Sequence, residues 1–289
     1  MMRTETVIDT VALQYNFDSE EKCDNAIEDI RERLEKYKYI VNDNCIVEYN
    51  YKTIATIDRG SFSYVKKGTM KATSVWYLSI KLAGLKTYIP WRDIVSHNCF
   101  LLVISYFNTR QLPFKVTQCD VALNIFTKYE NVLSLCTTRH STTQYYKANE
   151  EQLFDTTTYI EKFKSKKHKK DAVSHVCCYD KSNKEKLPYN LVRHEVSMQK
   201  KFFKSNGFDI GAIFKECNRY HVMYIPNKKR RQEIMDQYDS YDVLRQRDIK
   251  ALKLDRYRLF IDLKVVVDFA LELYNVNDSV LDQYLLEVV

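Results

Sequence analysis

The chain has 289 residues, of which 45% are hydrophobic and 13% aromatic, a composition that supports a packed core and excludes an intrinsically disordered protein. Its longest apolar runs are too short to span a bilayer, and MMRTETVIDT is not an apolar signal sequence, so we expect a soluble cytoplasmic protein. The net charge of +7 is local, because residues 160–204 hold 13 Lys and Arg against five Asp and Glu. This basic excess suits a polyanion such as DNA, and a solvated lysine-rich loop explains its run at 161–170 equally well.

Strands with two long helices are predicted for the first part of the chain. Apolar alternation indicates a strand over residues 6–17, and Asp18 or Ser19 then caps a helix whose apolar positions, from Cys23 to Leu34, recur at helical spacing. The remaining elements are predicted strands at 45–57, 62–67 and 75–82, and a buried helix over 94–107.

Further strands and then helices are predicted for the rest. The strands are expected at 115–126, 142–147, 156–163, 172–179 and 189–199, with a short helix near 131–136. Beyond Pro226 the pattern becomes helical, with an apolar stripe formed by Leu259, Leu263, Val266, Val267, Ala270, Leu271 and Tyr274. The order predicts an α+β fold: an antiparallel sheet with inserted helices in residues 1–225, and a helical C-terminal appendage in residues 226–289.

Familiar cofactor signatures are absent from the sequence. The eight cysteines do not have the spacing of a zinc site, and the adjacent Cys177 and Cys178 would point to opposite faces of a strand. We interpret the cysteines as free thiols of a reducing compartment. Neither a P-loop nor a dinucleotide-binding glycine motif is present, so nucleotide cofactors are not indicated.

Polar residues interrupt three otherwise apolar strands. The alternation in CDVALNIF, residues 119–126, places Asp120 and Asn124 on one face, and LVRHEVSMQ, residues 191–199, places Glu195 beside Arg193. In AVSHVCCYDK, residues 172–181, His175 and Tyr179 share a face with Cys177. Carboxylates are costly inside apolar strands unless they are paired or bind a cation. Two carboxylates with a histidine could hold Mg²⁺ or Mn²⁺.

Other interpretations fit the same residues. A buried ion pair between Arg193 and a carboxylate explains the strand carboxylates as well as a metal does. Tyr179 is one of 22 tyrosines, most of which serve packing. His175 could be a third ligand, a base, or a histidine satisfied within the sheet.

The order of these motifs resembles a known family. CDVALNIF, then CYDKSNKEKLPYN, then LVRHEVSMQKKFFKSNGFDIGAIF is similar to the replication initiation endonucleases of filamentous phages, and more loosely to those of staphylococcal-type rolling-circle plasmids. The resemblance covers residues 75–214 and is carried by short motifs. Two family features differ: Gln118 stands where the family has an arginine before its aspartate, and the His-x-His motif of many other rolling-circle nucleases is absent.

The resemblance implies a site-specific, metal-dependent DNA nickase that starts rolling-circle replication in a bacterial host cell. Tyr179 would attack a phosphodiester, become linked to the 5′-phosphate and release a 3′-OH, with Lys181 as the matching lysine. Asp120 and Glu195 match the acidic positions that would hold Mg²⁺ or Mn²⁺, with His175 as a candidate third ligand. Arg193 matches the arginine before the glutamate. DNA is the implied partner, with a host helicase and polymerase as further partners.

Basic residues are the predicted DNA contacts. They are Arg193 and two runs: Lys162, Lys164, Lys166, Lys167, Lys169 and Lys170, and then Lys228, Lys229, Arg230 and Arg231. Three alternatives stay open on sequence alone. A relaxase of a mobile element would use the same chemistry on another target, a sequence-specific DNA-binding protein would lack the nuclease, and a scaffold protein would not bind nucleic acid.

Overall fold

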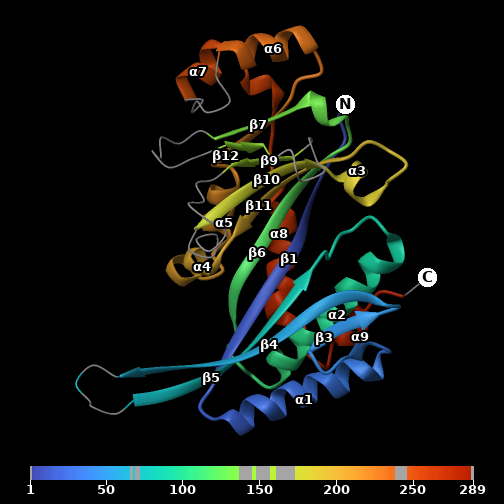
Figure 1. The fold of residues 1–289 in the computed structure, drawn as a ribbon, viewed down its shortest axis with the longest axis vertical. Helices are drawn as coiled ribbons and strands as arrows, with labels where there is room; N and C mark the ends of the chain where they lie inside the picture. Colours follow the sequence, from blue (N-terminus) through green and yellow to red (C-terminus); the bar gives the residue numbers. More distant parts are fainter. Residues whose placement is uncertain are drawn as a thin grey trace. The chain divides into compact units, whose positions relative to one another are not determined.

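A computed structural model describes residues 2–65, 68, 72–136, 145–147, 157–160, 173–237 and 246–287 (Figure 1). The chain forms two compact units: unit 1 comprises Met1–Val7 and Asp120–Val266, and unit 2 comprises Ile8–Cys119 and Val267–Val289. The predicted α+β class, the antiparallel pairing and the C-terminal helices are confirmed. Across the described ranges, no helix combines the length and the apolar content needed to span a membrane.

Unit 2 is built on antiparallel strands in the order β2-β3-β4-β5-β1-β6. The strands are β1 (Thr4–Phe17), β2 (Ile40–Val41), β3 (Ile46–Tyr49), β4 (Lys52–Val65), β5 (Ala72–Ala83) and β6 (Lys115–Ile125), of which β1 and β6 are divided between the units. Helices α1 (Glu20–Lys36) and α2 (Pro90–Thr109) pack against each other and against β4 and β5. The Ser19 side chain caps α1 at the Lys22 amide, as predicted.

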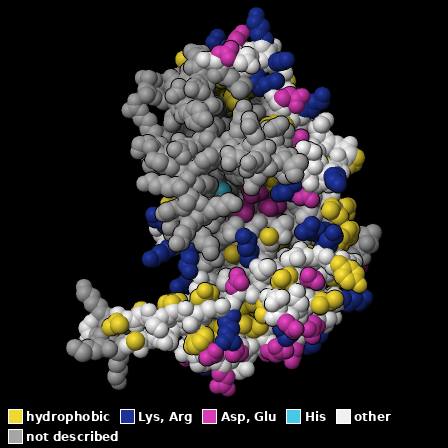
Figure 2. All heavy atoms as spheres, in the orientation of Figure 1, with side chains coloured by type: hydrophobic (Ala, Val, Ile, Leu, Met, Phe, Trp, Pro, Cys, Tyr) yellow, Lys and Arg dark blue, Asp and Glu magenta, His cyan; other side chains and the backbone are white. Residues whose placement is uncertain are grey.

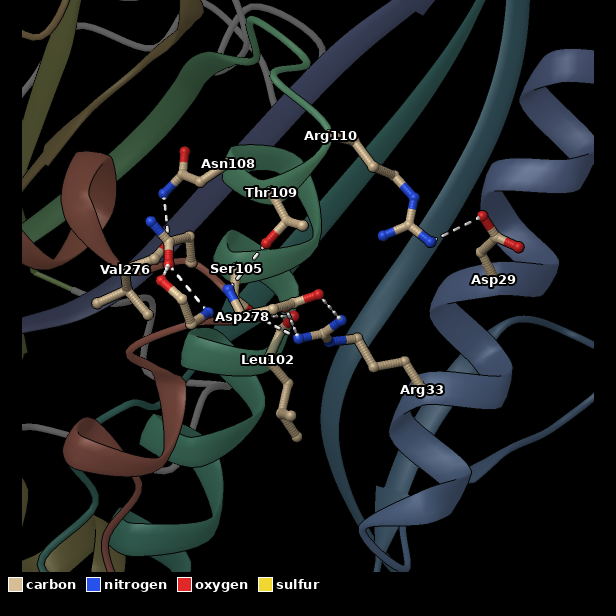
Figure 3. Close-up of polar contacts among 11 residues, drawn as sticks. Asp29, Arg33, Leu102, Ser105, Asn108, Thr109, Arg110, Val276 and Asp278 are labelled. Carbon is tan, nitrogen blue, oxygen red and sulfur yellow. Dashed lines mark hydrogen bonds and ion pairs between the residues drawn. The ribbon is translucent and has the colours of Figure 1, made fainter.

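Side chains of α2 hold the C-terminal segment of unit 2 in place. Asn108 Nδ2 donates to the carbonyls of Leu273, at 3.2 Å, and Val276, at 2.7 Å, where α8 (Leu263–Asn275) ends (Figure 3). Asn98 pairs with the backbone of Leu286 through two hydrogen bonds of 2.7 and 2.9 Å. These amides replace the partners that terminal backbone groups lack. The segment with α8 and α9 (Leu281–Tyr284) is thereby fixed on α2.

A charged pair supports the same segment from α1. Arg33 forms a salt bridge with Asp278, and its Nη2 also donates to Ser105 Oγ at 2.7 Å (Figure 3). Burial opposes ionisation of Asp278, but the hydrogen bond and charge of Arg33 outweigh it and lower the pKa of this carboxyl. Asp278 in turn donates its amide to Thr109 at 2.8 Å.

Unit 1 contains strands in the order β6-β11-β10-β9-β8 and a second, three-stranded sheet. The first group comprises the second half of β6, β8 (Tyr145–Lys147), β9 (Thr157–Ile160), β10 (Ser174–Asp180) and β11 (Val192–Met198). The small sheet comprises β7 (Val132–Cys136), β12 (Tyr220–Tyr224) and β13 (Arg258–Leu259). Its helices are α3 (Lys181–Glu185), α4 (Lys200–Asn206), α5 (Ile210–Cys217), α6 (Lys228–Gln237) and α7 (Gln246–Ala251), with 3-10 turns η1 (Tyr129–Asn131) and η3 (Asp255–Tyr257).

Three predictions about individual elements were wrong. Residues 45–57, predicted as one strand, are divided by a turn at residues 50–51 between β3 and β4, and β4 runs on through residues 62–65, which were predicted as a separate strand. Residues 132–136, predicted as part of a short helix, form strand β7, because pairing with β12 decides the state of a short apolar run that fits either structure. In α8 the buried positions are Val266, Phe269 and Leu273, whereas three members of the predicted stripe are exposed: Leu263, Leu271 and Tyr274. The helix was predicted correctly, but its buried face is rotated relative to the predicted stripe.

The predicted boundary at residues 225/226 remains a prediction. Residues 226–266 cluster with unit 1 and residues 267–289 with unit 2. In unit 1, α6 and α7 contribute Ile234 and Ile249 to a buried cluster with Met223 and Ile225 of the β12 region.

Removing the Asn108 amide should loosen the C-terminal segment. We expect Asn108→Ala to lower the free energy of unfolding by about 1–3 kcal/mol, because two carbonyls at the end of α8 lose their donor. Asn25→Ala on the exposed side of α1 is the matched control and should change stability by no more than about 0.5 kcal/mol. Denaturant titration measures both, and equal effects would refute the capping role.

Candidate active site

The predicted site residues of β10 and β11 lie on one face of their sheet. The antiparallel register sets Tyr179 opposite Arg193, Cys177 opposite Glu195 and His175 opposite Ser197. Directly paired residues project to the same side of a sheet, and each strand alternates with a period of two. The face sharing predicted from alternation is therefore confirmed for both strands.

Strand β6 adds the second carboxylate to this face through two side-chain hydrogen bonds. Ser197 Oγ donates to Asp120 Oδ1, and Arg193 Nε donates to Asn124 Oδ1 at 3.0 Å. The earlier residue of β6, Asp120, meets the later residue of β11, Ser197, and Asn124 meets the earlier Arg193, as expected for antiparallel strands. This register places Glu195 level with Ala122, between the two bonds.

We call the resulting arrangement the polar face. It consists of three residues from each strand: Asp120, Ala122 and Asn124 of β6; Ser197, Glu195 and Arg193 of β11; and His175, Cys177 and Tyr179 of β10. Glu195 occupies its centre, with Asp120, His175 and Tyr179 at diagonal positions. Diagonal neighbours in an antiparallel sheet lie about 7–8 Å apart at Cα, within reach of long side chains.

Burial differs between the centre and the rim of the polar face. Arg193 and Asn124 have no exposed surface, and Asp120, His175 and Tyr179 are each less than a tenth exposed. Glu195 and Cys177, at the centre, are half-buried. The central carboxylate of Glu195 is thus partly accessible to solvent, whereas the polar residues around it are buried.

The opposite face of the same strands is the core of unit 1. It presents Val176, Cys178, Val192 and Val196, all of which are buried. His194 lies on this side and shares a 3.0 Å hydrogen bond with Ser134 of β7. Burial lowers the pKa of His194 to about 3, so this histidine is neutral in the folded protein.

The connection after β10 brings a lysine onto Tyr179. Asp180 ends the strand, and its side chain caps α3 by accepting from the Asn183 amide at 2.9 Å. The short helix then places Lys184 Nζ over the Tyr179 ring, 4.9 Å from its centroid. Lys181, the predicted partner, is buried at the start of α3 with its ammonium 3.5 Å from Glu185. Sequence reasoning missed Lys184. The signal that could have predicted its position is Asp180, a capping residue that starts a helical turn directly after the strand.

A complete metal site is not assembled in the part of the chain that the structure describes. No group of three His, Cys, Asp or Glu side chains there is arranged to hold an ion. Asp120 and Glu195 share the polar face without His175 completing a three-ligand cluster. Two carboxylates nevertheless suit Mg²⁺ or Mn²⁺, which commonly take one or two carboxylates and keep bound water.

Only part of the predicted DNA contacts can be placed. The run from Lys162 to Lys170 lies outside the described residues. Lys228 and Lys229 are exposed at the start of α6, where Figure 2 shows Lys and Arg side chains on the surface. Arg230 and Arg231 donate to the carbonyls of Leu252 and Ile225, so they also hold the backbone. Arg193 would have to be uncovered to reach DNA, since it has no exposed surface.

Comparison with solved structures shows a structural likeness, whereas comparison with sequences does not. Neither a family model nor a curated protein matches the chain. Among solved structures, it is similar to one described as a rolling circle replication initiator protein from Geobacillus stearothermophilus, at 13% sequence identity. The TM-score is 0.35, and the match covers 95% of this chain and 98% of that chain.

Acid should destabilise the protein through His194. The unfolded histidine, with a pKa near 6.5, takes up a proton that the folded side chain refuses until pH is about 3, so stability falls as pH drops below 6.5. At pH 5 this single group should cost about 2 kcal/mol relative to pH 7. We expect His194→Asn to flatten the dependence of unfolding free energy between pH 6.5 and 5. An unchanged slope would show that other groups govern the pH dependence of stability. Burial also lowers the pKa of His221 to about 4, so His221→Asn is measured in parallel.

Proposed function

We propose that this chain is a DNA-nicking enzyme that initiates rolling-circle replication, with Tyr179 as its nucleophile. The observation that carries the proposal is the polar face, which gathers a tyrosine and two carboxylates onto one side of three adjacent strands. The sequence motifs that resemble replication initiators occupy these same three strands. A DNA substrate also agrees with the local basic excess of the chain.

The proposed reaction is a transesterification at a DNA phosphodiester. The Tyr179 hydroxyl oxygen bonds to phosphorus, the bond from phosphorus to the 3′ oxygen breaks, and the 5′ side stays on the enzyme. The tyrosine proton is lost, and the leaving 3′ oxygen takes up a proton to become a hydroxyl. A tyrosine has an ordinary pKa near 10, so a nearby cation helps by favouring the phenolate. Lys184 holds that position over the ring.

The carboxylates are proposed to bind a divalent metal. Asp120 and Glu195 would supply oxygen ligands to Mg²⁺ or Mn²⁺, with His175 as a candidate third ligand. A bound metal would polarise the scissile phosphate and offset its developing charge. Ser197 orients the Asp120 carboxylate through its hydrogen bond, a common way of fixing a metal ligand. Lys181 remains a candidate for stabilising the phosphate, although it is paired with Glu185.

A DNA-binding protein without nuclease activity is the second candidate. It is favoured by the lack of a three-ligand cluster among the described side chains. A covalent adduct between protein and DNA separates the two candidates, because only the nickase forms one. A relaxase would form the same adduct and differ in its target sequence.

Substitution of the proposed nucleophile gives the most direct test. Tyr179→Phe keeps the ring beneath Lys184 and removes the attacking oxygen, so the variant should fold and bind DNA but form no adduct. Wild type is incubated with Mn²⁺ and a supercoiled plasmid carrying its own locus, and nicked plasmid and phosphotyrosyl peptides are quantified.

The matched control is Tyr220→Phe, which removes a buried hydroxyl elsewhere in unit 1. We expect this control to retain nicking. Wild-type nicking by Tyr179→Phe, or an adduct mapped to another tyrosine, would contradict the assignment of Tyr179.

The carboxylates are tested by substitutions that preserve shape. Asp120→Asn and Glu195→Gln should each reduce metal-dependent nicking by at least about a hundredfold, while DNA affinity changes little. Glu233→Gln, in the exposed pair of α6 with Arg230, is the control and should nick at the wild-type rate. Calorimetric titration of Mn²⁺ gives a second measurement. Normal nicking and metal binding by both site variants would make the carboxylates structural.

A further inference from the structure

A polar pocket lies next to the polar face, in the connection between β10 and β11. Its volume is about 550 Å³, and its lining includes Asp180, Ser182, Asn183, Lys186, Tyr189 and Asn190. Asp180, the last residue of β10, directly follows Tyr179, so the pocket begins one residue after the proposed nucleophile. The reaction as proposed above assigns no role to this pocket.

One wall of the pocket is the exposed ring of Tyr189, which lies near a second aromatic ring. Tyr189 is 42% exposed, and its ring centroid lies 6.1 Å from that of Phe126, which follows β6. The guanidinium of Arg3 lies 4.1 Å from the centroid of the Phe126 ring. Arg3, Phe126 and Tyr189 thus lie in succession, with the two rings tilted by 33°, and the Tyr189 ring is open to solvent. Such surfaces accept a nucleobase because every base has a π-face.

The polar lining supplies groups for the rest of a nucleotide. Lys186 is exposed and offers an ammonium for a phosphate, and the exposed amides of Asn183 and Asn190 offer both donors and acceptors for a base edge. The loop that carries them is braced by two side chains. Asp180 accepts from Ser182 Oγ at 2.5 Å, and Ser182 Oγ accepts from the Leu191 amide at 3.2 Å.

We propose that this pocket binds a nucleobase of single-stranded DNA, stacked on Tyr189, with Lys186 on a neighbouring phosphate. The inference rests on the proposed function and assigns a subsite to its substrate. Tyr189 is four residues from Arg193, so the Cα atoms of Tyr189 and Arg193 lie at most about 14 Å apart. Arg193 is in turn the cross-strand neighbour of Tyr179. The stacked base therefore lies within a few nucleotides of the scissile phosphate and positions the strand for attack.

The test separates base stacking from phosphate binding and from cleavage. Binding is measured in the Tyr179→Phe background without divalent metal, using a fluorescent oligothymidylate and an abasic oligonucleotide of the same length. Replacing Tyr189 by Ala should raise the Kd for oligothymidylate about 5- to 150-fold and leave the Kd for the abasic strand unchanged. Tyr189→Phe should bind like the parent, since it keeps the ring. Lys186→Gln should weaken binding of both strands equally.

Tyr37→Ala is the matched control, because Tyr37 is 41% exposed and lies in unit 2. It should leave both affinities unchanged. Equal affinity of Tyr189→Ala and its parent for oligothymidylate, or equal loss on the abasic strand, would overturn the proposal. A free thymidine monophosphate that competes as well as the oligonucleotide would make this a mononucleotide site and overturn the strand assignment. Tyr189-dependent binding without any adduct in the wild type would retain the subsite and reject the nickase.

Discussion

The candidate site depends on the register of β6 against β11. A slip of one residue would exchange the two faces of β6 and bury Asp120 in the apolar core of unit 1. Two buried hydrogen bonds specify the register, one from Ser197 to Asp120 and one from Arg193 to Asn124. Burying a polar group is costly without its partner, so each bond penalises every alternative pairing of the strands. The polar face is thus both the proposed site and the feature that fixes its own geometry.

The fully buried Arg193 has a structural role in the sheet. Its guanidinium donates to Asn124, and leaving one partner of a buried hydrogen bond unsatisfied costs about 1–3 kcal/mol. Arg193 therefore contributes to the stability of the sheet whether or not DNA binds. Glu195 differs from Arg193 because it is half-buried and remains accessible at the centre of the face.

Strand alternation was enough to predict the polar face, because a period of two fixes which residues share a side. The same reasoning failed where the outcome depends on distant partners. Residues 132–136 form a strand because β12 pairs with them, and the buried side of α8 is set by contacts such as the stacking of Phe269 on Phe100, 5.1 Å apart. Lys184 was missed because its position follows from a five-residue helix capped by Asp180, a local geometry that periodicity does not describe.

Tyr179 lies one residue before the end of β10, where its backbone is rigid and the chain is about to leave the sheet. Its backbone is held by pairing with Arg193 on one side and with Thr157 of β9 on the other. The chain then turns at once into α3 and the loop that carries Tyr189, so groups able to bind DNA can gather where the paired strand ends. A nucleophile in the middle of the strand would be equally rigid but farther from these groups. Because Tyr179 is less than a tenth exposed, DNA would have to uncover its oxygen, as it would have to uncover Arg193.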